Sequence, residues 1–135
     1  MPRPPVVAVF NTSPDTVDVL RMAFEFDGFV VVSAFTFEVR DGRVNLDSFL
    51  TVHEPDVIVY DIALPYQANW QLLQHLRQSA PLRGTPIVIT TTNAAQVRPY
   101  AAGEPVHEII GKPYDLRQLI EVVRQAIPDA CERRH

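Results

Sequence analysis

The sequence predicts an α/β fold: a doubly wound, five-stranded parallel sheet with helices on both faces. Five short apolar runs, rich in β-branched residues, recur along the chain, and apolar residues at helical spacing lie between them. Strands that are apolar throughout are typical of a parallel sheet that helices cover on both sides. The length of 135 residues fits one domain with its own core. We expect a single domain over 1–135, with its core at about 5–127 and a frayed tail at 128–135.

The first strand and the first helix are clearly marked. Val6–Phe10 is a continuous apolar run, which predicts a buried strand. Ser13 suits the N-cap of the helix that follows, and Pro14 suits its first position. Gly28 is typical of the left-handed residue that stops a helix, and Phe29–Ala34 then predicts a second strand.

The segment after the second strand is less regular. An Asp-Gly pair marks a turn within Phe35–Val44, so we expect a hairpin-like extension or a long loop there. The apolar residues of Leu46–His53 suggest a short helix. Val57–Tyr60 predicts the third buried strand, which ends at Asp61.

The second half of the chain alternates in the same way. It predicts a helix through Trp70–Arg77, a strand at Ile87–Ile89, a helix at Ala94–Ala102, a strand at Val106–Ile110 and a helix capped by Asp115. Pro99 weakens the second half of the fourth of the five predicted helices. The connections between parallel strands should be right-handed.

Composition excludes several classes of protein. The net charge of −4 argues against direct nucleic-acid binding by the domain as a whole. No apolar run approaches the ~18 residues of a membrane span, and the start lacks the apolar core of a signal peptide, so we expect a cytoplasmic protein without membrane contact. The lone Cys131 cannot form an internal disulfide, and His53, His75 and His107 do not have the spacing of a metal site.

Polar residues gather where the predicted strands end, and sites in open parallel sheets form beyond that edge. Asn11 and Thr12 follow the first strand, Asp61 the third, Thr90 and Thr91 the fourth, and Gly111 and Lys112 the fifth. Lys112 is the only lysine among 12 Lys and Arg residues. A carboxylate nucleophile, a hydroxyl and an ammonium at one edge could handle a phosphoryl group, with Mg²⁺ shielding the carboxylate.

Three motifs give this edge a family resemblance. They are Asp61–Pro65, Thr91-Thr92 after an apolar strand, and Lys112–Asp115. Together they resemble the receiver domain of two-component response regulators, over about residues 5–127. The resemblance implies a flavodoxin-like sheet with the strand order 2-1-3-4-5.

The resemblance also implies roles for particular residues. Asp61 would accept a phosphoryl group from a histidine kinase or phosphotransfer protein, and Thr91 would move to contact that group. Lys112 would be its salt-bridge partner, and the backbone carbonyl of Ala63 would bind the metal with Asp61. The surface Ala94–Ala126 would then change and pass the signal to a downstream protein.

The chain departs from the family pattern at several positions. Asn11 and Thr12 stand where the family places two acidic metal ligands, so we expect Mg²⁺ to bind weakly at these positions. Ile109 stands three positions before the lysine, where an aromatic residue is usual. The segment Phe35–Val44 resembles an insertion.

Three functions remain open from the sequence. The first is a stand-alone receiver in phosphorelay signalling, which acts by phosphorylation-dependent protein contact at Asp61 and is no enzyme beyond self-phosphorylation from a phosphodonor. The second is a pseudo-receiver that serves as a phosphorylation-independent interaction module or homodimer. The third, ranked below these, is a flavodoxin-like nucleotide or flavin binder, although the polar loop Asn11–Asp15 contains no glycine.

Overall fold

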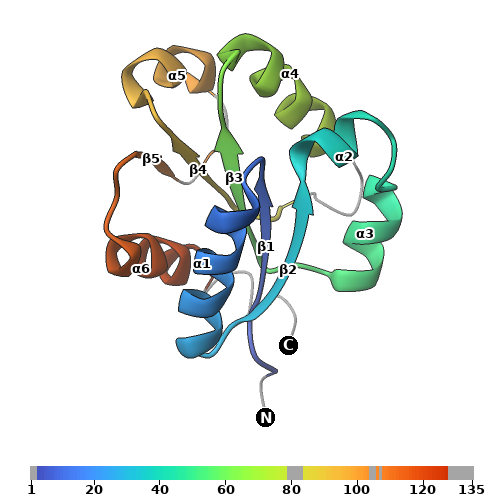
Figure 1. Cartoon of the computed structure of the whole chain (residues 1–135), viewed down its shortest axis with the longest axis vertical. Coiled ribbons are helices and arrows are strands. Elements are labelled where there is room, and N and C mark those ends of the chain that lie inside the picture. The colour runs from blue at the N-terminus through green and yellow to red at the C-terminus, as the bar shows by residue number, and fades with distance from the viewer. Residues whose placement is uncertain (1–2, 79–83, 104–105, 107, 128–135) are drawn as a thin grey trace.

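The computed structural model describes residues 3–78, 84–103, 106 and 108–127 (Figure 1). One parallel sheet runs through it in the order β2-β1-β3-β4-β5, as predicted. The strands are β1 (Val6–Asn11), β2 (Val30–Phe35), β3 (Val57–Ile62), β4 (Ile87–Thr91) and β5 (Glu108–Gly111). The helices are α1 (Pro14–Phe26), α2 (Thr36–Arg40), α3 (Leu46–His53), α4 (Tyr66–Arg77), α5 (Ala94–Ala101) and α6 (Leu116–Ala126). Within these described ranges, no helix has the length and apolar character needed to span a bilayer.

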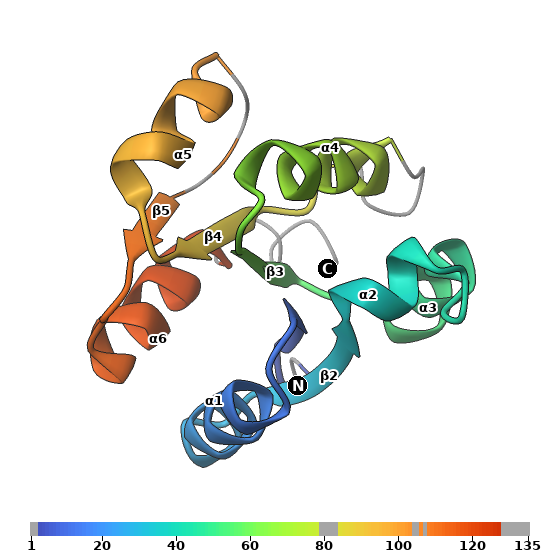
Figure 2. The ribbon, with the colours of Figure 1, turned by 45° about the horizontal axis from the view of Figure 1, so that its top comes forward.

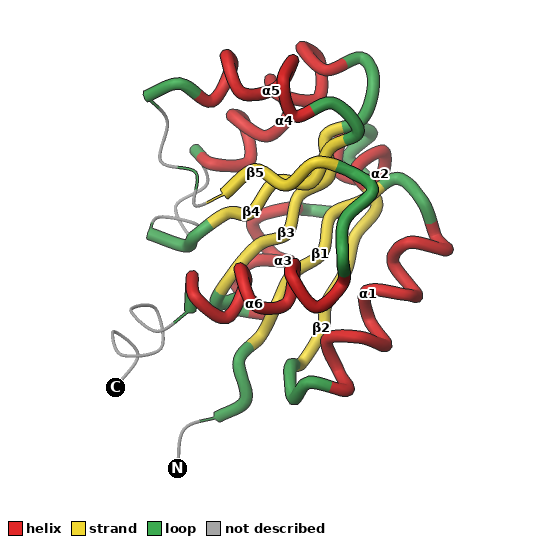
Figure 3. The backbone as a smooth tube through the Cα atoms, turned by 90° about the vertical axis from the view of Figure 1, so that its left-hand side faces the viewer, coloured by secondary structure: helices red, strands yellow, loops and turns green. Residues whose placement is uncertain are grey.

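Two layers of helices cover the sheet (Figure 2). Successive strand residues point to opposite faces, so each strand contributes to two cores. One core joins Val7, Val9, Val57, Val59 and Val88 to buried side chains of α1 and α6. The other joins Ala8, Phe10, Ile58, Tyr60 and Ile89 to buried side chains of α3, α4 and α5. Figure 3 shows the carboxyl ends of the strands gathered at one edge, between the two layers.

The predicted helix ends agree with the structure. The Ser13 hydroxyl accepts a hydrogen bond from the backbone N–H of Thr16 at 3.3 Å, and Gly28 has a φ of +94°. The Asp115 carboxylate accepts from the N–H of Arg117 at 2.8 Å. Pro99 lies inside α5, which ends two residues later. These caps set where α1 and α6 meet the strands that precede them.

The expectation of a hairpin-like extension or long loop at 35–44 is wrong. The segment contains the helix α2, which the sequence analysis did not predict. The Glu38 carboxylate caps the start of this helix, because it accepts a hydrogen bond from the N–H of Phe35 at 3.3 Å. The Asp-Gly pair ends this helix, with Gly42 at a φ of +79°, and does not form a hairpin turn. Val39 and Val44 pack against the core on the α4 side of the sheet, which draws the segment onto the domain. The tail predicted at 128–135 lies outside the described residues.

Tyr60 is a buried polar residue within this core. It is 1% exposed, and its hydroxyl has no hydrogen-bond partner among the residues described. Burial raises the pKa of Tyr60, and the neighbouring Asp61 charge raises it further. The unpaired hydroxyl should therefore cost stability at neutral pH and should resist ionisation at high pH.

We expect Tyr60→Phe to raise the free energy of unfolding by about 1 kcal/mol at pH 7, because it removes an unpaired buried hydroxyl. In the wild type, the raised pKa means that the folded state holds the phenolic proton more tightly than the unfolded chain. This contribution is fully present below the unfolded pKa of about 10 and is lost as the pH rises above it. Urea titrations at pH 7 and above pH 10 measure this loss. Between the two pH values, the free energy of unfolding of the variant should fall by less than that of the wild type. The partly exposed Tyr100→Phe is the control; a Tyr60→Phe protein less stable than wild type at pH 7 would contradict the prediction.

Candidate functional site

The alternation of side chains along the strands brings three polar residues to one corner of the sheet. Asp61 and Thr90 are paired in the β3–β4 register. Each follows by two positions a core valine, Val59 or Val88, that faces α1 and α6. Asn11 lies two positions after Val9 on the neighbouring strand β1 and projects to the same face. The sequence analysis placed Asn11, Asp61 and Thr90 just after their strands. In the structure all three lie within the strands, near their carboxyl ends.

The Asp61 carboxylate is held by two donors. The Lys112 Nζ lies 2.6 Å from Asp61 Oδ1, and the Thr90 hydroxyl donates to the same oxygen at 2.8 Å. Asp61 is 4% exposed, while the Lys112 side chain keeps 25% of its surface in solvent. A buried carboxylate is tolerated when an opposite charge and a hydrogen bond compensate for its lost hydration, and both are present here.

Lys112 reaches this carboxylate because the backbone fixes its position. Its N–H donates to the carbonyl oxygen of Thr91 at 2.7 Å, which ties the chain after β5 to the end of β4. The predicted meeting of Asp61 and Lys112 at one edge is therefore present in the structure. A short, charge-assisted contact of this kind is among the stronger hydrogen bonds in proteins.

Thr91 projects to the opposite face of the sheet. Its hydroxyl donates to the carbonyl oxygen of Ile62 at 2.8 Å, and the N–H of Asn93 donates to it at 3.4 Å. The hydroxyl that contacts Asp61 is thus that of Thr90, a role that the sequence analysis did not assign. Counting in steps of two from Val88 would have placed it, once the end of β4 was known. The movement of Thr91 toward a phosphoryl group stays a prediction.

The two residues at the expected acidic positions serve the turn after β1. Asn11 is 2% exposed, and its Oδ1 accepts from the N–H groups of Thr12 at 2.7 Å and Ser13 at 3.0 Å. Thr12 is exposed. Asn11 therefore caps the start of the β1–α1 connection, the role that Asn often has in turns.

The loop after β3 is closed by a residue that the sequence analysis did not assign. The Asn69 side-chain amide, in the first turn of α4, donates to the carbonyl oxygens of Ala63 at 2.7 Å and Pro65 at 3.2 Å. Nearby, the hydroxyls of Tyr66 and Thr92 lie 3.1 Å apart and join the start of α4 to the end of β4. The carbonyl expected to bind a metal thus already accepts a hydrogen bond within the protein.

Mg²⁺, the metal that the resemblance implies, does not fit these residues. It prefers carboxylate oxygens in octahedral geometry. Here Asp61 Oδ1 faces an ammonium, and the oxygens of Asn11 and Ala63 accept hydrogen bonds from the chain. Within the described ranges, no group of three or more His, Cys, Asp or Glu residues could hold a metal ion. We therefore derive no chemistry through a metal at this site.

Tyr114 belongs to the electrostatic surroundings of the same carboxylate. It is half-buried and follows Lys112 by two positions. Burial raises its pKa, and the Asp61 charge raises it further. The phenol of Tyr114 therefore ionises less readily than that of a free tyrosine.

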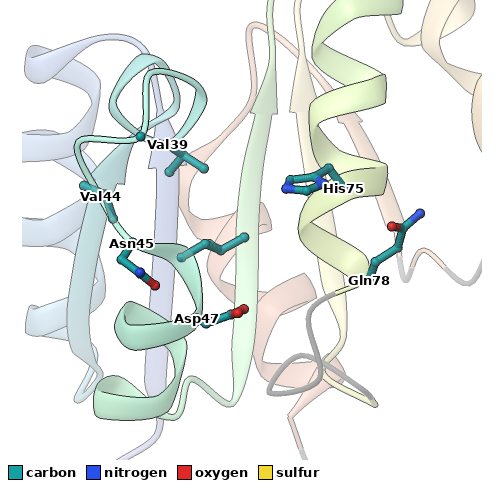
Figure 4. A pocket seen from close by; sticks show the side chains of 8 residues that line it. Val39, Val44, Asn45, Asp47, His75 and Gln78 are labelled. Carbon is teal, nitrogen blue, oxygen red and sulfur yellow. The ribbon is translucent and has the colours of Figure 1, made fainter.

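A separate cleft of about 530 Å³ lies between the α2–α3 segment and the end of α4 (Figure 4). Val39, Val44 and Leu46 give it an apolar wall. Across from them lie His75, on α4, and Gln78, at the C-cap of α4. The segment at 35–44, which contains α2, thus forms part of one side of a concave surface.

The fold and the corner formed by Asp61 and Lys112 are those of a receiver domain. Residues 7–124 match the response regulator receiver domain family, and the chain belongs to it. Two-component signalling is therefore the class of process in which the chain takes part.

Several proteins are similar to this chain at 27–28% sequence identity. A 14.6 kDa protein from the sodA1 3′ region of Leptolyngbya boryana is 27% identical, over 88% of this chain and 87% of its own length. Response regulator Rre1 of Synechocystis is 27% identical, over 71% of this chain and 45% of its own. The transcriptional regulator NtrC of Bradyrhizobium is 28% identical, over 72% of this chain. The match spans only 20% of NtrC and less than half of Rre1.

Solved structures share the fold at lower identity. A CheY-like receiver domain protein from Methanospirillum hungatei superposes with a TM-score of 0.74 at 19% identity, covering 97% of this chain and 98% of that one. Chemotaxis protein CheY4 of Vibrio cholerae gives 0.73 at 16% identity, covering 90% of this chain and 98% of that one. These similarities agree with the sheet order and with the helices on both faces.

Proposed function

We propose that this chain is a receiver module that signals by protein–protein contact, takes up no phosphoryl group and has no catalytic activity of its own. The observation that supports this most directly is the lack of acidic side chains at positions 11 and 12, next to Asp61. One oxygen of Asp61 accepts from both Lys112 and Thr90, while Asn11 and Thr12 occupy the positions expected to carry metal ligands. This arrangement favours the pseudo-receiver over the phosphorylated receiver.

The chemical reason is the charge at the site. Transfer of a phosphoryl group to a carboxylate brings two anionic groups together, and cations must neutralise the charge that develops. Lys112 supplies one positive charge and already balances Asp61. Without a metal to add further positive charge, the approach of a phosphodonor to Asp61 is unfavourable.

Intact mass after incubation with acetyl phosphate, with and without Mg²⁺, tests this proposal. We expect no added phosphoryl group under either condition, while a receiver domain that has the acidic pair gains one in a parallel reaction. Mg²⁺-dependent addition to the wild type that disappears in Asp61→Asn would overturn the proposal.

Phosphorylation of the wild type at Asp61 would support the alternative function, a phosphorylation-dependent regulator. The observation in its favour is that Asp61 and Lys112 still meet at the carboxyl edge of the sheet. A histidine kinase or phosphotransfer protein would then be the donor. The α5–β5–α6 surface within Ala94–Ala126 would be the part that responds to phosphorylation.

We propose that a partner binds where α1 exposes apolar side chains. Val19, Met22 and Phe26 of α1 are 48%, 71% and 94% exposed, and their spacing places them on one face of the helix, opposite its core residues. Within the described part of Ala94–Ala126, Tyr100 is the only large exposed hydrophobic residue. Asp15 lies one turn before Val19, so a helix with an apolar stripe and basic flanks would complement α1.

We expect Met22→Ser/Phe26→Ser to lose partners that the wild type retains, because both exposed side chains leave the α1 stripe. The free energy of unfolding should change by no more than about 0.5 kcal/mol, since neither residue is buried. Quantitative mass spectrometry of proteins retained from an extract of the source cells measures the loss. Tyr100→Ser, on the opposite layer, is the matched control. Retention that falls with Tyr100→Ser and not with the α1 variant would contradict the prediction.

A further inference from the structure

Two adjacent threonines at the end of β4 have the same burial and different partners. Thr90 and Thr91 are both fully buried. The Thr90 hydroxyl donates to Asp61 Oδ1 at 2.8 Å, whereas the Thr91 hydroxyl donates to the Ile62 carbonyl at 2.8 Å. Thr90 therefore contacts the Asp61 side chain, whereas Thr91 contacts only the backbone, and the two residues can be compared directly.

The Thr90 contact lies on the same oxygen that Lys112 uses. Asp61 Oδ1 accepts from the ammonium at 2.6 Å and from the hydroxyl at 2.8 Å. Two donors on one oxygen restrict the rotation of the carboxylate. Because the side chain is 4% exposed, the protein and not solvent provides most of the stabilisation of the carboxylate.

We propose that Thr90 is a positioning residue that, with Lys112, holds the Asp61 carboxylate in an internal ion pair, so that the lysine ammonium and not a metal ion balances its charge. The inference rests on the proposed function and deepens it, because it names the residues that hold the Asp61 carboxylate in a site without a metal ion. Thr90 acts through Asp61, and removal of its hydroxyl should loosen the hold on Lys112.

The single lysine of the chain makes this measurable. Amine acetylation with a limiting reagent, followed by intact mass and peptide mapping, reports Lys112 without interference from other lysines. The N-terminal amine reacts in the same tube and serves as the internal reference. The measurement involves no phosphodonor, so its outcome is independent of whether Asp61 can be phosphorylated.

We expect Thr90→Val to raise the acetylation rate of Lys112, relative to the reference amine, by about three- to tenfold, the factor that corresponds to one hydrogen bond. Thr90→Ser should restore the wild-type rate, because serine keeps the hydroxyl. Thr91→Val should leave the rate unchanged, although it also removes a hydroxyl that is fully buried. Asp61→Asn should give the largest increase.

Equal rates for Thr90→Val and wild type, or equal increases for Thr90→Val and Thr91→Val, would overturn the inference. A second measurement serves if Thr90→Val does not fold. Wild-type protein labelled with ¹⁵N-lysine should give one side-chain ammonium signal that persists at neutral pH, because Asp61 slows its exchange, and Asp61→Asn should abolish it. Absence of the signal from the wild type would also overturn the inference.

Discussion

The paired substitution Asn11→Asp/Thr12→Asp is expected to give this chain a Mg²⁺ site and an Asp61 that accepts a phosphoryl group. The side chain at 11 projects from the end of β1 to the same face as Asp61. A carboxylate there would add negative charge beside Asp61, where the wild type has a neutral amide. Two or three neighbouring carboxylates attract Mg²⁺, and the metal then supplies the positive charge that phosphoryl transfer needs.

The effect of Mg²⁺ on the free energy of unfolding tests this prediction, because the double variant and the wild type should respond differently. Without metal, repulsion between the carboxylates should lower the free energy of unfolding of the double variant by about 1 kcal/mol or more. Saturating Mg²⁺ should reverse the loss, by about 2.7 kcal/mol at a concentration 100 times the dissociation constant. The wild type should show no change beyond the general effect of salt, which NaCl at matched ionic strength measures.

Phosphorylation of the double variant completes the comparison. Intact mass after acetyl phosphate treatment should show one added phosphoryl group that requires Mg²⁺. The same variant with Asp61→Asn should show none. A double variant that binds Mg²⁺ but gains no phosphoryl group would mean that the missing acids are not the only barrier, and Thr90 would be the next residue to replace.

Most strands and helices could be predicted from the sequence because they depend on the pattern of residues along each segment, whereas the strand order followed from the family resemblance. Continuous apolar runs such as Val57–Tyr60 predict strands buried on both faces, and the caps at Ser13 and Asp115 predict where the flanking helices begin. The sequence also predicted the meeting of Asp61 and Lys112, because parallel strands end at a common edge. These predictions rest on local patterns and on topology.

The partners within the site could not be predicted in the same way. Which threonine reaches Asp61 depends on the β3–β4 register and on whether β4 continues to Thr91, and neither is visible in the letters. A shift of one residue reverses every side chain on a strand, so Thr90 and Thr91 would exchange roles. The helix at α2 was missed for a different reason. Its N-cap is Phe35 and not one of the Ser, Thr, Asp or Asn residues that usually mark a helix start, although the Glu38 contact that caps it spans only three residues.

Lys112→Met is expected to destabilise the fold by about 2–4 kcal/mol, because it leaves a carboxylate that is 4% exposed with Thr90 as its remaining side-chain donor. The loss should fall below the upper values known for buried pairs, since the lysine side chain is 25% exposed and its contact is partly screened. Asp61→Asn should cost less, because the ammonium that it leaves behind can reach solvent. Denaturant titrations at pH 7 measure both losses.

The double variant Asp61→Asn/Lys112→Met isolates the ion pair from the other contacts of each side chain. Its loss should be smaller than the sum of the single losses by about 1–3 kcal/mol, which is the coupling energy of the pair. A second cycle on Arg124 and Asp27 provides a control matched in distance, because their charged atoms also lie 2.6 Å apart while their side chains are 51% and 38% exposed. That coupling should stay below about 1 kcal/mol. Equal couplings in the two cycles would mean that burial adds nothing to the Asp61–Lys112 contact. The pair would then stabilise the fold no more than an exposed ion pair does.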